Sequence, residues 1–239
     1  MNNSEHDVYD EYFSFRNVAP NFYDDYSLPA YLKQVLPKER NAAILDIGCG
    51  FGQMLKALQA EGYKNLSGID VSAEAIEFCS GQGLNVEKIG TISNYCREIR
   101  NKYDFIVMSH VIEHIEKHEI IETLRSIRTY LLKEGGRFMV MTPNAQSNTG
   151  CYWAYEDFTH TTVFTAGSLF FVLKSAGFKN VEFIDPLGTV GSRPVVKLIK
   201  RILIPLYATN MALWNLVTNS SFHRPSPQIF TFEIKAVAS

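Results

Sequence analysis

The sequence predicts an α/β fold in which helices cover both faces of a mostly parallel sheet. Short apolar runs of strand length alternate with segments whose apolar residues recur at helical spacing. Glycines stand where helices are expected to end, at Gly62 after the first and at Gly177 after the last. Because strands that alternate with helices form parallel βαβ units, we expect a three-layer, Rossmann-like sandwich.

Seven segments have the composition of strands. The first, 42–47, is a continuous apolar run that ends in Gly-Cys-Gly, which is typical of a buried parallel strand. The second helix begins after Ser72, whose hydroxyl is suited to cap a helix start. The expected strands are 42–47, 65–69, 84–89, 103–109, 136–141, 180–184 and 229–237. The other expected helices are 53–60, 116–132 and 165–176.

Two segments fall outside this alternation. Residues 1–40 are rich in aromatic and acidic side chains, which favours either a helical cap on the domain or a pair of surface helices. Residues 187–227 interrupt the strand–helix rhythm and are predicted to form an insertion before the last strand. A length of 239 residues suits a single domain, 1–239, that carries both additions.

Charge and cysteine content limit the compartment and the partners. A formal net charge of −2 argues against a nucleic-acid binder, which would present a basic surface. The first ten residues have neither the basic region nor the apolar region of a signal peptide. The four cysteines, Cys49, Cys79, Cys96 and Cys151, form no CxxC pair. We therefore expect a cytoplasmic protein with reduced thiols and no nucleic-acid partner.

A glycine-rich turn follows the first expected strand and opens the first helix. It reads Asp46-Ile-Gly48-Cys-Gly50-Phe-Gly52. Glycine allows a sharp turn and lets a ligand approach the main chain, and the free amides of the helix start favour an anionic group. Asp70 ends the next strand, where a carboxylate can accept both ribose hydroxyls of a nucleoside.

The glycine spacing and the neighbouring carboxylate indicate which nucleoside binds. Dinucleotide sites carry GxGxxG, whereas this turn is GxGxG with Asp46 in front of it. A carboxylate there would repel a pyrophosphate and attract a ligand that bears an ammonium and a sulfonium group. S-adenosylmethionine carries both and has no phosphate, so we predict it as the cofactor. A nicotinamide dinucleotide, and with it an oxidoreductase, is the alternative.

Three motifs together resemble the class I S-adenosylmethionine-dependent methyltransferases. They are 44–52 (ILDIGCGFG), 68–70 (GID) and 103–114 (YDFIVMSHVIEH). The pattern is similar to the branch that includes the ubiquinone-biosynthesis O-methyltransferases and many sugar methyltransferases. The resemblance spans 40–185 and implies a seven-stranded sheet whose last strand is antiparallel. It implies an enzyme, although a non-catalytic cofactor-binding subunit that regulates another protein stays an alternative.

The resemblance also implies roles for individual residues. Asp46, Gly48 and Gly50 would line the methionine end of the cofactor, and Asp70 would hold the ribose. The remaining expected cofactor contacts are Gly52, Val71, Thr91, Ile92 and Ser109. Many family members carry an acidic residue in the loop after the third strand, and this chain does not, so its adenine contact departs from the family pattern.

His110-Val-Ile-Glu113-His114 has the HxxEH spacing of some zinc peptidases. A zinc site of that kind needs both histidines on one helix face and a third ligand. His110 instead follows a strand directly, so we expect no metal. We expect Glu113 and His114 to shape the pocket floor near the methyl group, with a hydrogen-bonded structural His114 as the alternative.

The segment 154–165 (AYEDFTHTTVFT) lies between the fifth strand and the last helix, where α/β folds bind ligands. It resembles the His-x-x-x-Phe-Thr segment of many bacterial surface-sugar methyltransferases. A base near the working pH helps a hydroxyl to react, typically by about 10²–10⁴-fold. We predict His160 as this base, with His114 as the second candidate, and Asp157 as the group that orients it. Alternatively, His160 supports the helix that begins near Thr165.

The segment 194–217 is apolar and carries basic residues at Lys197, Lys200 and Arg201. Polar residues and a proline interrupt it too often for a bilayer span, which needs about 20 mainly apolar residues. It could contact an anionic membrane surface peripherally, form a dimer contact or wall the pocket. The oligomeric state stays open.

The expected acceptor is a small-molecule or sugar hydroxyl, nucleotide- or lipid-linked, in bacterial surface-glycan biosynthesis. The resemblance of 154–165 and the basic, apolar insertion favour this acceptor. A quinone-precursor phenol and an amine are the alternatives.

Overall fold

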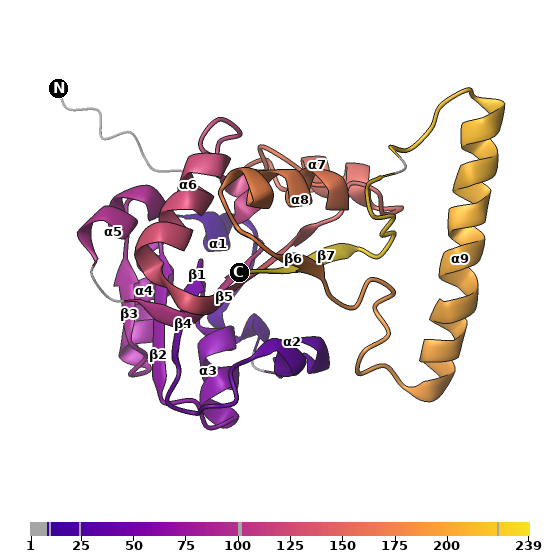
Figure 1. The fold of residues 1–239 in the computed structure, drawn as a ribbon. Helices are drawn as coiled ribbons and strands as arrows, with labels where there is room; N and C mark the ends of the chain where they lie inside the picture. The colour runs from indigo at the N-terminus through magenta and orange to yellow at the C-terminus, as the bar shows by residue number, and fades with distance from the viewer. Residues whose placement is uncertain (1–8, 10, 24, 100–101, 224) are drawn as a thin grey trace.

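The sheet of this protein has seven strands in the order β3-β2-β1-β4-β5-β7-β6 (Figure 1). The computed structural model describes residues 9, 11–23, 25–99, 102–223 and 225–239. β7 runs antiparallel to its neighbours β5 and β6, and the other paired strands are parallel. The predicted fold class and the antiparallel last strand are therefore confirmed.

The central strands are buried on both faces, which explains their continuous apolar sequences. In β4, Phe105 and Val107 belong to the core on one face, while Ile106 and Met108 belong to the core on the other. A strand covered on both sides needs apolar residues without alternation. The strands are β1 (Ala43–Ile47), β2 (Asn65–Asp70), β3 (Val86–Lys88), β4 (Tyr103–Ser109), β5 (Leu132–Pro143), β6 (Val181–Phe183) and β7 (Glu233–Ala238).

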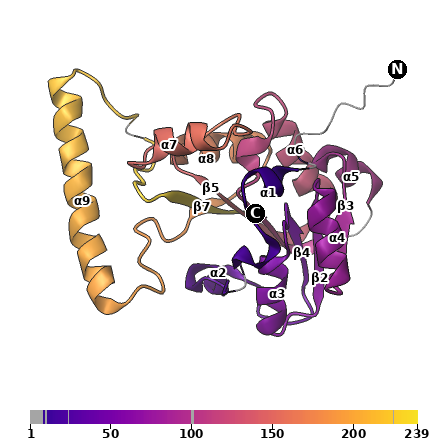
Figure 2. The same ribbon diagram turned by 180° about the vertical axis from the view of Figure 1, so that it is seen from behind.

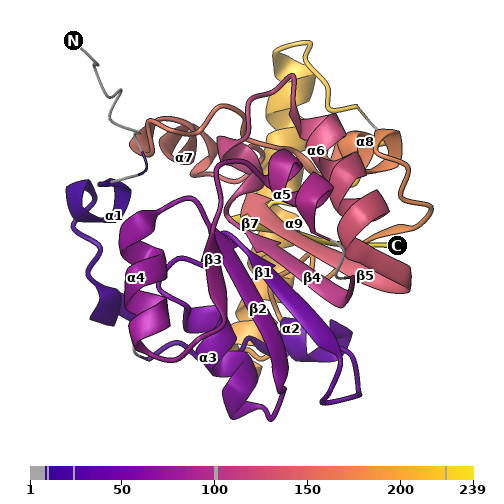
Figure 3. The ribbon, with the colours of Figure 1, turned by 90° about the vertical axis from the view of Figure 1, so that its left-hand side faces the viewer.

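Helices form the two outer layers (Figure 3). One core cluster unites the sheet with α2 (Ala30–Val35), α3 (Gln53–Ala60) and α4 (Ala73–Gly81). The other unites it with α5 (Ile92–Glu98), α6 (Ile120–Ser126) and α8 (Ala166–Ser175). Ser72 caps α4 as expected, because its hydroxyl accepts the amide of Ala75. The carboxyl ends of the parallel strands thus meet at one edge, where the predicted motifs stand.

Three helical segments differ from the sequence-based expectation. The helix expected over 116–132 is shorter than predicted: it consists of α6 followed by one π-helical turn (Ile127–Leu131). A separate 3-10 turn (Ile112–His114) precedes it. Residues 116–119 are exposed and contribute nothing to the core. The structure adds two helices, α5 and α7 (Gly150–Glu156), that the sequence did not predict. Each buries so few side chains that it leaves no periodic apolar signal.

The N-terminal segment reaches both the core and the strand-end edge of the sheet. Of the residues 1–40, positions 1–8, 10 and 24 lie outside the described residues. Leu28, Leu32 and Leu36 pack into the core beside α3. The short helix α1 (Tyr12–Phe15) and the 3-10 turn Pro20–Tyr23 precede them. α1 has no buried residue of its own, so contacts at the strand ends position it.

Between β6 and β7 the chain forms α9 (Pro194–Val217), a helix that stands apart from the sandwich (Figures 1 and 2). It is 24 residues long, continues through Pro205 and buries none of its residues. Its exposed apolar side chains are Val195, Val196, Leu198, Ile199, Ile202, Leu203, Leu206, Leu213, Trp214, Leu216 and Val217. Among the described residues, no helix combines the length and the hydrophobicity that crossing a bilayer requires.

Candidate active site

The turn between β1 and α3 has a backbone that only glycine adopts at little cost. Gly48, Gly50 and Gly52 have φ values of +73°, +49° and +77°, in the left-handed region. A Cβ atom on Gly48 would lie 2.2 Å from Cγ2 of Val111, and one on Gly52 would lie 2.5 Å from Cδ1 of Leu84. The turn is therefore fixed both by conformation and by the side chains that press against it.

Asp70 holds this turn to the end of β2. Its Oδ2 accepts the amide of Gly50 at 2.8 Å, and its Oδ1 accepts the amide of Ser72 at 2.9 Å. Burial raises the pKa of Asp70, and these backbone amides partly oppose that rise. The predicted pair of glycine turn and strand-end carboxylate is thus in direct contact.

Asp46 lies at the end of β1 and is only 3% exposed. Burial is the larger cause and repulsion from Asp70 the smaller cause that together raise the pKa of Asp46 to about 7. A buried carboxylate with this pKa is stabilised as an anion when a cation binds beside it. Near the same turn, Oε1 of Gln53 is buried without a hydrogen-bond partner. These two observations fit a ligand that brings a positive charge and hydrogen-bond donors, as the ammonium of S-adenosylmethionine would.

The other predicted cofactor residues stand along the same edge. Val71 follows Asp70 and packs partly buried against the core, while Ser109 ends β4. Thr91 is the N-cap of α5, and its hydroxyl accepts the amide of Asn94 at 3.2 Å. Ile92 is the first residue of that helix. The loop expected after β3 is therefore the start of a helix, which fixes its backbone.

The helix α1 lies over the glycine turn. The ring of Phe13 packs on Phe51 with centroids 4.5 Å apart, and its Cζ lies 3.4 Å from where Gly50 would carry a Cβ. On the neighbouring helix α4, Glu74 accepts a weak hydrogen bond of 3.3 Å from the Ser14 hydroxyl. These contacts make the N-terminal segment part of the wall of the site.

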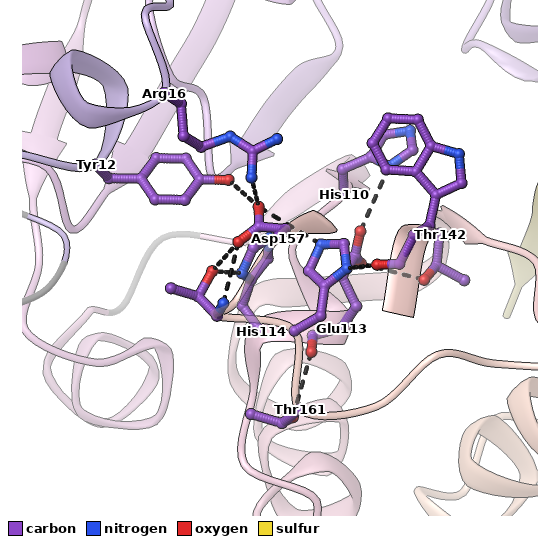
Figure 4. Close-up of polar contacts among 11 residues, drawn as sticks. Tyr12, Arg16, His110, Glu113, His114, Thr142, Asp157 and Thr161 are labelled. Atoms are coloured by element: carbon purple, nitrogen blue, oxygen red, sulfur yellow. Dashed lines mark hydrogen bonds and ion pairs between the residues drawn. The ribbon is translucent and has the colours of Figure 1, made fainter. Parts of the chain in front are cut away.

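Asp157 is the centre of a side-chain network at the same edge (Figure 4). Its carboxylate accepts the hydroxyls of Tyr12 and Thr159, both at 2.6 Å, and pairs with the guanidinium of Arg16 at 2.5 Å. Burial would raise the pKa of Asp157, but the hydrogen bonds from Thr159 and Tyr12 outweigh it and lower the pKa to about 2. Asp157 is therefore an anion that ties α1 to the end of α7.

Hydrogen-bond partners fix the ring orientation of His160 and His114. The backbone oxygen of Trp153 can only accept, so Nδ1 of His160 donates to it at 2.6 Å. The Thr159 hydroxyl already donates to ionised Asp157, so it accepts from Nδ1 of His114 at 2.8 Å. Burial lowers the pKa of His114, which keeps that ring neutral. With Nδ1 of each ring acting as a donor, Nε2 is the nitrogen left to accept.

His110 and Glu113 form a second polar group beside these rings (Figure 4). Glu113 is fully buried, and its Oε2 accepts the Thr142 hydroxyl at 3.1 Å. His110 has a left-handed φ of +55° and bonds Glu233 through Nε2 at 2.8 Å. Partial burial would lower the pKa of His110, but the carboxylates of Glu113 and Glu233 raise it, so the ring is protonated at neutral pH.

The structure brings His114, Asp157 and His160 together, with His114 and His160 ring centroids 4.7 Å apart. The group that orients His160 is the Trp153 oxygen, while Asp157 lies 3.7 Å from its Nε2. The structure adds partners that the sequence did not single out. Tyr12 carried a weak signal, because it stands in the aromatic N-terminal segment. No sequence signal pointed to the other four partners, which are Arg16, Trp153, Thr142 and Glu233.

A cavity of about 690 Å³ is lined in part by Glu233, the hydrogen-bond partner of His110. It is formed where the chain before α9, the start of α2 and the start of β7 meet. Lys200 of α9 lines it and donates to the backbone oxygen of Gly188. An ion pair also lines the cavity, between Nζ of Lys235 and Oε2 of Glu233 at 3.3 Å.

Comparisons with known proteins place the fold and the motifs in one family. A family model described as a methyltransferase domain matches residues 21–183, which is more than half of the chain. A search of curated protein sequences finds no significant match.

Several solved structures share the fold. A SAM-dependent methyltransferase from Archaeoglobus fulgidus has a TM-score of 0.64 and 22% identity, over 97% of this chain and 99% of that one. A possible histamine N-methyltransferase from Thermotoga maritima has a TM-score of 0.60 and 18% identity, over 95% of this chain and 96% of that one. The DhpI–SAM–HEP complex has a TM-score of 0.58 and 11% identity, over 99% of both chains.

Proposed function

The chain belongs to the methyltransferase domain family, and from that premise we propose that it methylates a hydroxyl group of a small-molecule or sugar acceptor. It is a methyltransferase, and its cofactor is S-adenosylmethionine. The cofactor supplies an electrophilic methyl carbon bonded to a positively charged sulfur. The acceptor oxygen approaches that carbon in line with the carbon–sulfur bond, so alignment contributes much of the acceleration.

The observation that carries a hydroxyl acceptor is the orientation of His160. Its Nδ1 is held by the Trp153 oxygen, so Nε2 is free to take a proton from the acceptor. Oδ2 of ionised Asp157 lies 3.7 Å from Nε2 and stabilises the charge that the ring then gains. His114 presents a second free Nε2 and is the alternative base. A neutral amine would need neither.

For the cofactor, we propose the contacts that the motifs imply. Asp46 pairs with the ammonium group, and the turn of Gly48, Gly50 and Gly52 supports the methionine end. Each carboxylate oxygen of Asp70 accepts one backbone amide, and its second lone pair remains available to accept a ribose hydroxyl. The adenine would lie among Val71, Thr91 and Ile92, with Ser109 near the methionine end.

For the acceptor side, we propose that residues 1–40 cap the site and that 187–227 is an insertion that widens it. The cavity beside Glu233 offers room for the part of the acceptor that does not react, and Lys200 and Lys235 would suit a phosphate there. The exposed apolar side chains and the basic residues of α9 support a peripheral contact with an anionic membrane. Together these features favour a nucleotide- or lipid-linked sugar in bacterial surface-glycan biosynthesis.

Replacement of His160 tests the proposed base. His160→Ala should lower kcat at least tenfold, while the Kd for S-adenosylmethionine changes less than twofold, because the imidazole lies on the acceptor side. His118→Ala, which removes an exposed histidine of the same region, is the matched control. Unchanged turnover in the His160 variant would remove it from the mechanism.

The acceptor class needs its own experiment. Methyl transfer from labelled S-adenosylmethionine should be measured with nucleotide sugars, lipid-linked sugars, quinone-precursor phenols and amines. We expect product only with a hydroxyl acceptor, and mass spectrometry should place the label on oxygen. Transfer to an amine alone would reject the hydroxyl, and no transfer by a protein that binds the cofactor would favour the regulatory alternative.

A further inference from the structure

Three groups with free lone pairs converge beside the proposed methyl-transfer site. One side-chain atom from each of Glu113, His114 and His160 lies within 4.8 Å of the other two. All three residues come from the carboxyl-end edge of the sheet, His160 from the segment after α7 and the others from the turn after β4. Figure 4 shows Glu113 and His114 side by side within the polar network around Asp157.

Both imidazoles are oriented as in a protein metal site. Metal-bound histidines almost always donate the proton of the other ring nitrogen to a backbone oxygen or a carboxylate system. His160 donates from Nδ1 to the Trp153 oxygen, and His114 donates from Nδ1 to Thr159, which in turn donates to Asp157. With Nδ1 of each ring engaged as a donor, Nε2 is the nitrogen available to a metal ion, and Nε2 of His160 also lies 3.7 Å from Oδ2 of Asp157.

Glu113 completes the set with a buried oxygen that lacks a hydrogen-bond partner. The residue is 0% exposed, and its Oε2 is satisfied by Thr142. Oε1 is buried and accepts no hydrogen bond, and its ion-pair partner is Nδ1 of His110, 3.4 Å away. Its lone pairs can therefore still accept a donor or a cation at closer range.

From these contacts we propose that Glu113, His114 and His160 bind one divalent first-row transition-metal ion, of which Zn²⁺ is the type. Two imidazole nitrogens and one carboxylate oxygen are a common ligand set for such ions. At about 2.1 Å from a tetrahedral ion, ligand atoms lie about 3.4 Å apart, so from separations of at most 4.8 Å any two ligand atoms would approach by no more than about 1.4 Å. The site differs from the HxxEH pattern of the sequence because His110 stays outside it and His160 replaces it.

Three protein ligands leave one position of a tetrahedral ion open, which suits an oxygen of the acceptor. A hydroxyl bound there has its pKa lowered by the charge of the ion. In the metal-bound protein His160 is then a ligand, and the ion replaces it in activating the hydroxyl. The bound hydroxyl would release its proton to water, and its oxygen would take the methyl group as the carbon–sulfur bond breaks and S-adenosylhomocysteine leaves. This part of the inference rests on the proposed function, whereas metal binding itself does not.

Metal analysis of the full chain tests the site. The purified protein is treated with a chelator, dialysed against ZnCl₂, and its bound zinc is measured by mass spectrometry. We expect about one zinc per chain, and tetrahedral Co²⁺ absorption when CoCl₂ replaces zinc. Glu113→Gln, His114→Asn and His160→Asn should each weaken zinc binding by at least about 100-fold, whereas His118→Ala should leave it unchanged.

Two results would overturn the site. One is a wild-type protein that retains no zinc after dialysis, and the other is zinc retained equally by the His160→Asn and His118→Ala variants. S-adenosylhomocysteine binding, measured on every variant, shows that each one is folded. Methyl transfer at an undiminished rate without bound metal would refute the role of the ion in activating the hydroxyl and leave the proposed function intact. Zinc binding without transfer to a hydroxyl would support the metal site and reject the proposed function.

Discussion

The two halves of the proposed site are built from different parts of the chain. The centre of the proposed cofactor half is backbone and two carboxylates within 46–72, where Asp70 accepts the amides of Gly50 and Ser72. The acceptor half is a network of side chains from five separate segments, in which Asp157 alone joins Tyr12, Arg16 and Thr159. One half is therefore local in sequence, and the other exists only when distant segments meet.

This difference determines how each half responds to substitution. A glycine turn against a packed wall has no room to adjust, so a single methyl group displaces it. A network with several donors to one carboxylate can lose one of them and keep the rest. We therefore expect large effects in the cofactor half and graded effects in the acceptor half, and four experiments test that ordering.

The largest effect is expected from Gly48→Ala. Gly48 and Gly83 have the same φ of +73°, but a new Cβ would meet Val111 at 2.2 Å at position 48 and nothing within 4 Å at position 83. The left-handed backbone costs about 1–2 kcal/mol in both variants, and overpacking adds about 1–3 kcal/mol at position 48. Thermal unfolding should show a Tm that falls by roughly 5–15 °C for Gly48→Ala and about half as much for Gly83→Ala.

Calorimetry should show that Gly48→Ala also loses cofactor binding, since the displaced turn carries the site. Equal Tm shifts in the two glycine variants would mean that the Val111 side chain moves to make room for the new methyl group. The cofactor half would then be less rigid than its packing indicates.

Asp46→Asn should have the next largest effect, in opposite directions for stability and binding. Removing a hydrogen bond to a charged group costs about 1.5–3 kcal/mol, so the Kd for S-adenosylmethionine should rise roughly 10- to 150-fold. At pH 8 the free protein should become more stable, because the variant no longer buries a carboxylate whose pKa is raised to about 7. An unchanged Kd would place the ammonium elsewhere.

The Kd for the cofactor should also depend on pH, with a change of at most about tenfold per pH unit. Asp46 has its pKa raised to about 7 by burial, so it is protonated in the free protein below that pH and ionised above it. A cationic ligand binds the ionised form, so the Kd should fall as pH rises from 5 to 7 and level off above. The Asp46→Asn variant should show no such slope, and a slope that persists in it would assign the titration to another group.

The smallest effect is expected from Tyr12→Phe in the acceptor half. The change removes the 2.6 Å hydrogen bond to Asp157 but leaves the bonds from Arg16 and Thr159. A loss of about 1.5 kcal/mol, the low end for a hydrogen bond to a charged group because two other partners of Asp157 remain, should lower Tm by roughly 3–6 °C, with the cofactor Kd nearly unchanged. Tyr155→Phe, at an exposed tyrosine of α7, is the control and should leave Tm unaltered. A drop as large as that of Gly48→Ala would show that the acceptor half is equally rigid.

Some features could be predicted because their signals are local. The fold class follows from apolar strands between amphipathic helices, and the cofactor from a carboxylate, three glycines and a second carboxylate at fixed spacing. The short helices α5 and α7 could not be predicted, because each buries too little surface to leave a periodic pattern. The isolation of α9 was equally hidden, since an apolar sequence is normally a sign of burial.

By itself the sequence determined the order of the strands, the glycine turn and the two carboxylates that flank it. These depend on backbone conformation and on residues a few positions apart, which a linear chain displays directly. Only the tertiary structure decided that Tyr12 and Arg16 reach Asp157 and that Glu113, His114 and His160 converge. The physical reason is that hydrogen bonds and buried charges act over a few ångströms in space, and no pattern along the chain records which distant side chains folding brings within that range.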